Sequence, residues 1–137
     1  MSLKRAYKGV TMTRPIVPAP EDPAAPKTEE YLDTTFAGDV TFSKPLGIDQ
    51  EAALESADAE LQALIQANQY GPASLMRAML SGILPCVERM EVTGINPQPS
   101  LDNWPLRPRT QILSFTAWLW VEMGKLYTDS LEPIPNA

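Results

Sequence analysis

The apolar residues between Thr110 and Leu131 recur at helical spacing over the most apolar stretch of the chain. One face of the predicted helix collects large apolar side chains, namely Ile112, Phe115, Leu119, Met123 and Leu126. A second stripe contains Trp120 and Tyr127, so the helix is apolar around most of its circumference and belongs at the centre of the fold. Glu122 and Lys125 interrupt it, which argues against a membrane span.

Trp118 breaks this pattern. At about 100° per residue it points roughly 200° away from Trp120, on the side that also carries Ser114 and Glu122. Either another part of this chain or another subunit must cover it, because a large aromatic side chain is seldom left in water.

Two further helices are predicted, over residues 49–69 and 72–93. The first has Asp49 as its N-cap, an apolar stripe and an outer face rich in carboxylates, which we interpret as a solvated acidic surface. The second starts at Pro72, is kinked or restarted at Pro85 and continues to Gly94.

The N-terminal part follows different patterns. Residues 1–29 are rich in proline and lack a periodic apolar face, which predicts an extended arm. Pro15 and Pro18, and Pro20 and Pro23, also have the PxxP spacing of a polyproline ligand. Residues 30–47 alternate between apolar and polar side chains on either side of Ala37-Gly38-Asp39, which predicts a short β-hairpin.

Residues 94–109 form a loop with four prolines. Trp104 within this loop either plugs the domain's own core or anchors a partner. Arg107 and Arg109 stand just before the central helix, where they could bind a phosphate or carboxylate or pair with the acidic first helix.

Charge is distributed unevenly along the 137 residues. Residues 1–14 carry four bases and no acid, whereas residues 15–68 carry eleven acids and two bases. The acidic balance argues against a general nucleic-acid binder. We expect a protein made in the cytoplasm, because no apolar signal segment follows the basic start.

The residue types needed for several kinds of chemistry are missing. Without histidine the chain has no Ser-His-Asp or Cys-His system, and one cysteine provides no zinc cluster and no internal disulfide. No glycine-rich phosphate loop and no EF-hand loop occurs. We therefore expect no catalytic residue, metal or cofactor, and no small-molecule substrate.

Together these patterns predict a mainly α fold. A domain of three to four helices over residues 48–132 would follow the arm (1–29) and the hairpin (30–47), with a tail at 133–137. The predicted function is a non-enzymatic structural subunit of a larger assembly, such as a bacteriophage capsid, connector or tail, whose arm packs on neighbouring copies or other subunits. The alternative is an adaptor module that binds one partner protein and presents a flexible PxxP ligand. The candidate contact residues are Pro15, Pro18, Pro20, Pro23, Trp104, Arg107, Arg109 and Trp118.

Overall fold

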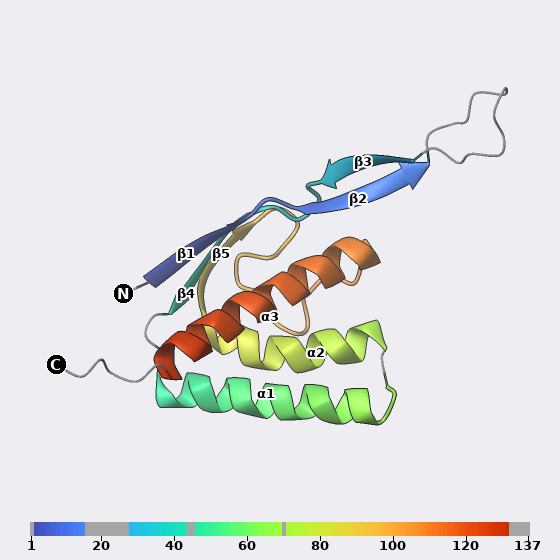
Figure 1. Ribbon diagram of the computed structural model, residues 1–137. Helices are drawn as coiled ribbons and strands as arrows, with labels where there is room; N and C mark the ends of the chain where they lie inside the picture. Colours follow the sequence, from blue (N-terminus) through green and yellow to red (C-terminus); the bar gives the residue numbers. More distant parts are fainter. Residues whose placement is uncertain (1, 16–27, 44–45, 70, 132–137) are drawn as a thin grey trace, which may run out of the picture.

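The described residues of the N-terminal segment form β-strands, where the sequence predicts an extended arm over residues 1–29. The computed structural model (Figure 1) describes residues 2–15, 28–43, 46–69 and 71–131. Its first elements are β1 (Ser2–Tyr7), β2 (Val10–Pro15), β3 (Thr28–Asp33) and β4 (Gly38–Ser43). Helices α1 (Ile48–Gln66), α2 (Pro72–Ile83) and α3 (Arg109–Leu131) follow, with β5 (Val87–Val92) between α2 and α3. The fold is therefore mixed α/β, and the prediction of a mainly α domain with an N-terminal arm is wrong.

The strands β1 to β4 form one long antiparallel hairpin that is divided into two parts. In the inner part β1 pairs with β4, and in the outer part β2 pairs with β3. Gly9 joins β1 to β2 with φ 105°, and a Cβ there would overlap the carbonyl oxygen of Asp33. Only glycine fits this bend, because the left-handed region and the close backbone both exclude a side chain.

The predicted hairpin over residues 30–47 is also wrong in its pairing. Residues 28–33 and 38–43 do not pair with each other; they are successive segments of one leg, and both pair with the N-terminal strands. Gly38 does not form the turn between them but lies against β5, where a Cβ would overlap the carbonyl oxygen of Glu91.

The second predicted helix ends ten residues early. It stops at Ile83, and a single 3-10 turn over Leu84–Cys86 contains Pro85. The following residues form β5 and pair with β4, which gives a three-stranded sheet in the order β1-β4-β5. Proline cannot continue a helical ladder, so the chain is free to turn into a strand whose Met90 and Val92 are buried.

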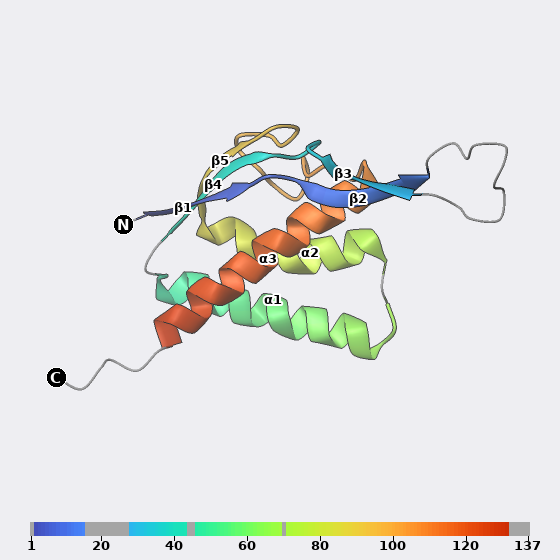
Figure 2. The ribbon, with the colours of Figure 1, turned by 45° about the horizontal axis from the view of Figure 1, so that its top comes forward.

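The three helices cover one face of this sheet, with α1 farthest from it (Figures 1 and 2). Between the layers lies a core of fully buried side chains from sheet and helices, among them Val40, Phe42, Leu80, Ile83, Met90, Ile112, Phe115, Leu119 and Met123. The outer face is polar and carries the ion pairs Lys4–Asp39 (3.4 Å) and Arg89–Glu91 (3.2 Å). This division between a buried and a solvated face is usual for an antiparallel sheet.

The helix ends and contacts follow from local sequence. The N-cap of α1 is Gly47 rather than the predicted Asp49, and its N–H donates to the side-chain oxygen of Gln50 at 2.7 Å. Gly82 allows α1 and α2 to pack closely, because a Cβ at this position would meet Ala57 Cβ at 2.8 Å.

Candidate functional site

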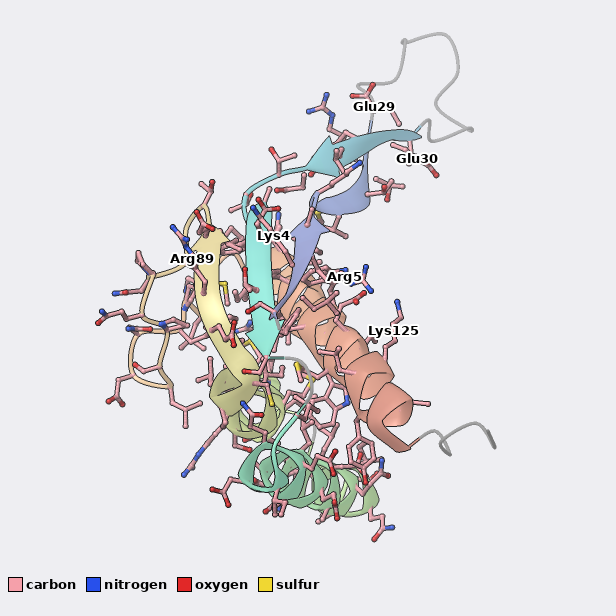
Figure 3. All side chains as sticks on the ribbon, turned by 90° about the vertical axis from the view of Figure 1, so that its left-hand side faces the viewer. Lys4, Arg5, Glu29, Glu30, Arg89 and Lys125 are labelled. Atoms are coloured by element: carbon pink, nitrogen blue, oxygen red, sulfur yellow. The ribbon has the colours of Figure 1, made fainter. Side chains whose placement is uncertain are left out.

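The β2–β3 ribbon projects from the body of the molecule beyond the end at which α3 begins (Figures 1 and 2). Its strands form a separate two-stranded sheet. Figure 3 shows Glu29 and Glu30 of β3 on this projecting part, away from the helices. A two-stranded ribbon is only marginally stable in water.

Few side-chain contacts hold the ribbon. On one face the Arg14 side chain lies 4.9 Å from the centre of the Tyr31 ring and pairs with Glu29 at 2.6 Å. At the root, Gln111 of α3 donates to the carboxylate of Asp33 at 2.7 Å. This hydrogen bond, together with two from Thr35, holds the pKa of Asp33 below its usual value. The opposite face exposes Leu32, of which 55% is accessible to solvent.

A hollow of about 330 Å³ lies between α1 and α3; we call it the acidic pocket. Its walls are Leu54, Glu55 and Asp58 of α1 and Trp120, Gly124 and Tyr127 of α3. The Tyr127 hydroxyl donates to Glu55. Burial first, and then the negative charge of Glu55, raise the pKa of Tyr127. The pocket thus combines aromatic rings with carboxylates, which is the chemistry that receives a cation.

Two adjoining hollows, of about 290 and 160 Å³, share Ala73, Met76 and Leu106. They lie between the first turns of α2 and the loop that leads to α3; we call them together the basic groove. Arg77, Arg107 and Arg109 line it together with one carboxylate, Asp102. The three arginines are exposed, and no ion pair joins any of them to a described residue. Leu101 and Leu106 expose 47% and 58% of their surface here, so the groove offers both positive charge and apolar area.

The aromatic residues selected from the sequence lie within the chain's own packing. Trp104 is buried, stacks on Phe115 and donates from its ring N–H to the Thr116 hydroxyl at 3.2 Å. Trp118 is half-buried beneath Tyr7 of β1, with ring centres 5.0 Å apart. The chain itself covers Trp118, and it does so with part of the segment that the sequence predicts to be an extended arm.

Of the four prolines predicted as contact residues, only Pro15 lies in the described part of the chain. Pro15 ends β2 at the far end of the ribbon, whereas Pro18, Pro20 and Pro23 lie outside the described residues. Arg107 and Arg109, by contrast, come together with Arg77, which the sequence reasoning missed. The position of Arg77 could be predicted from the sequence, because it lies one helical turn after Ala73 and therefore on the same face at the start of α2.

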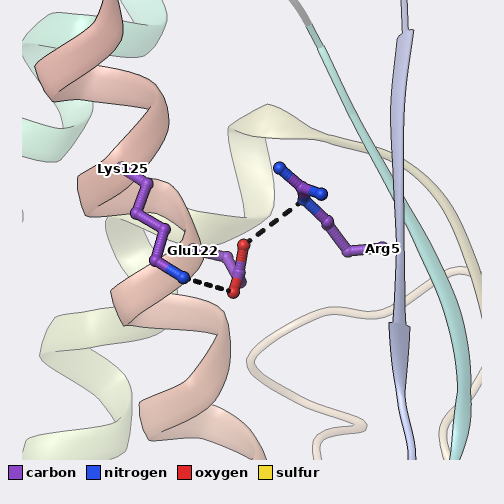
Figure 4. Close-up of polar contacts among 3 residues, drawn as sticks. All are labelled: Arg5, Glu122 and Lys125. Carbon is purple, nitrogen blue, oxygen red and sulfur yellow. Dashed lines mark hydrogen bonds and ion pairs between the residues drawn. The ribbon is translucent and has the colours of Figure 1, made fainter.

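In the described part of the chain, every buried side-chain nitrogen and oxygen atom has a hydrogen-bond partner. Glu122 is buried at 8% exposure and lies between Arg5, at 3.5 Å, and Lys125, at 3.2 Å (Figure 4). Burial raises the pKa of the Cys86 thiol to about 11. Across the described segments, no group of three or more histidine, cysteine, aspartate or glutamate side chains could hold a metal ion.

No protein-family model, no curated protein and no solved structure matches this chain. No helix in the described part of the chain combines the length and the apolar character that crossing a membrane requires.

Proposed function

We propose that this protein is a non-enzymatic structural subunit of a larger assembly, and that the β2–β3 ribbon packs on a neighbouring subunit. The ribbon carries the proposal. It extends past the helices, forms a sheet of its own and exposes Leu32, although a ribbon of two strands gains little stability in water alone. A neighbour that covers its outer face or adds a strand to its edge would supply the missing burial and hydrogen bonds.

The residue chemistry supports a role without catalysis. The thiol of Cys86 is buried and held protonated, and the buried Glu122 is neutralised by two cations. The Cys86 thiol is therefore a poor nucleophile, and the Glu122 carboxylate is already engaged in ion pairs within the chain. A particle built from many copies, such as a bacteriophage capsid, connector or tail, would suit a subunit with a projecting ribbon.

The test is the mass of the protein in solution, measured by light scattering over a range of concentrations. In the ribbon-deleted variant, an Asn-Gly turn replaces residues 11–32 and joins Val10 directly to its partner Asp33. We expect the full chain to form a defined oligomer and the ribbon-deleted variant to form a smaller species with an unchanged circular dichroism spectrum of the helices.

Two point variants separate contact from stability. Leu32→Thr removes the exposed apolar side chain of the ribbon but keeps strand propensity. As a control, Ile65→Gln removes an exposed apolar side chain from α1 but keeps helix propensity. Only Leu32→Thr should weaken association. A full chain that stays monomeric at every concentration, or a ribbon-deleted variant with the oligomeric state of the full chain, would overturn the proposal.

A further inference from the structure

The acidic pocket and the basic groove lie at opposite ends of the helical layer. α1 and α3 run in opposite directions, so the first half of α1 and the second half of α3 meet at one end (Figure 1). The groove is built at the other end, where α2 and α3 begin. Arg109 and Gly124 are fifteen positions apart along α3, which is about 22 Å at the rise of an α-helix. One molecule can therefore use both surfaces at the same time.

Gly124 indicates that something enters the acidic pocket. Glycine in a helix interior costs about 1 kcal/mol relative to alanine, so its presence needs a reason. For Gly82 the reason is internal, since a Cβ would collide with Ala57. At Gly124 no atom of the described residues lies within 4 Å of the position that a Cβ would take. Packing against the described part of the chain does not require this glycine, whereas a group arriving from outside would use the space that it leaves open.

The walls of the pocket determine the kind of group that fits. A guanidinium stacks on aromatic rings such as those of Trp120 and Tyr127, and it pairs with carboxylates such as those of Glu55 and Asp58. The basic groove carries three exposed arginines that form no ion pair with a described residue. The exposed Leu106 beside these arginines adds apolar area to the groove, and Leu54 does the same for the pocket.

We infer that copies of this chain associate head to tail, with an arginine of the basic groove of one copy inserted into the acidic pocket of the next. The inference rests on the proposed role as an assembly subunit and names its contact. Because the two surfaces differ, the contact is heterologous and repeats into a ring or a filament. The β2–β3 ribbon projects at the arginine end, so it extends towards the copy whose acidic pocket those arginines enter (Figures 1 and 2).

A mixing experiment tests the contact. Asp58→Lys reverses the charge of the acidic pocket, and Arg107→Glu with Arg109→Glu reverses that of the basic groove. Each variant alone should lose association by tenfold or more. Mixed together they should form a one-to-one dimer, since one intact pocket and one intact groove remain. The control Glu60→Lys reverses an exposed charge on α1 that does not line the pocket, and it should associate like the unmodified chain.

A second pair of variants addresses the pocket without changing charge. Gly124→Leu fills it, whereas Gly124→Ala adds one methyl group. Both should raise helix stability, but only the leucine should abolish association. If Gly124→Leu and Asp58→Lys both leave the oligomer intact while ribbon deletion dissociates it, the head-to-tail contact is wrong and the proposed function stands. If the unmodified chain is a monomer at all concentrations, both are wrong.

Discussion

Tyr7 tests whether the N-terminal segment belongs to the folded core. Its ring is 7% exposed and lies 4.9 Å from the ring of Phe115 and 5.0 Å from that of Trp118. Truncating a buried aromatic side chain to alanine costs about 3 to 5 kcal/mol. We expect about 3 kcal/mol for Tyr7→Ala, at the lower end of this range, because β1 is an edge strand that can adjust. A free arm would instead lose less than about 0.5 kcal/mol.

Urea denaturation followed by tryptophan fluorescence measures this cost directly, because Trp118 lies against Tyr7. With a slope of about 2 kcal/mol per molar urea, the midpoint should fall by about 1.5 M. Tyr7→Phe keeps both ring contacts and should cost less than about 1 kcal/mol, and Lys8→Ala should leave the midpoint within error. All variants are compared at one protein concentration, since association adds to apparent stability. An unchanged midpoint for Tyr7→Ala would refute the packing of β1 on α3.

Three further predictions concern side chains of the helices and the core. Gly82→Ala should lower the free energy of unfolding by about 1 to 3 kcal/mol through overpacking. Gly124→Ala should raise the free energy of unfolding by up to about 1 kcal/mol. Thermal melts that rank the two variants the other way would contradict this prediction. Cys86 should react with iodoacetamide at pH 8 at least about a hundredfold more slowly in the folded protein than in denaturant. The reason is that a pKa raised from 9.0 to about 11 reduces the thiolate population, and burial blocks access to the sulfur. Equal rates in the two states would show that the thiol is accessible in the folded protein. Arg5→Ala should destabilise the protein by about 1 to 2 kcal/mol, because it leaves the buried Glu122 with one cation. Combining Arg5→Ala with Glu122→Gln should recover part of that loss. If the two effects simply add in urea melts, the two side chains are not coupled.

The sequence predicts a helix well where the spacing of apolar residues within that segment is enough to define it. The periodic face from Ile112 to Leu126 locates α3, and the burial of these residues confirms that face as core. The sequence places the end of this helix too late because Cys86, Val87 and Met90 fit the continuation of a helical face to Gly94. Pro85 was the deciding residue, since it ended the helix rather than kinking it.

The strands were harder to find because their partners are distant in sequence. Ser2 pairs with Ser43 and Tyr7 with Gly38, so the partner of each N-terminal residue lies beyond the proline-rich stretch. A local signal did exist, since Val10, Thr11, Met12 and Thr13 alternate in the manner of a strand. The density of prolines after position 14 outweighed it in the prediction.

The candidate surfaces show the same division between local and distant information. Arg107 and Arg109 were found because they are neighbours in sequence. The acidic pocket was not found, because its halves come from α1 and α3, more than sixty residues apart. The carboxylates of α1 were correctly placed on an outer face, but only the fold brings Trp120 and Tyr127 beside them.

The division of one hairpin into an inner and an outer part has a mechanical consequence. The legs of the β2–β3 ribbon lead into β1 through Lys8 and Gly9 and into β4 through residues 34–37, and β4 pairs with β5 from Gly38 to Phe42. A pull on the ribbon along its axis therefore acts on β4 parallel to the strand and perpendicular to its ladder hydrogen bonds. Such a shearing force is shared by all the hydrogen bonds of the ladder at once instead of opening them one after another. Tension applied to the ribbon would therefore be transmitted to the central sheet.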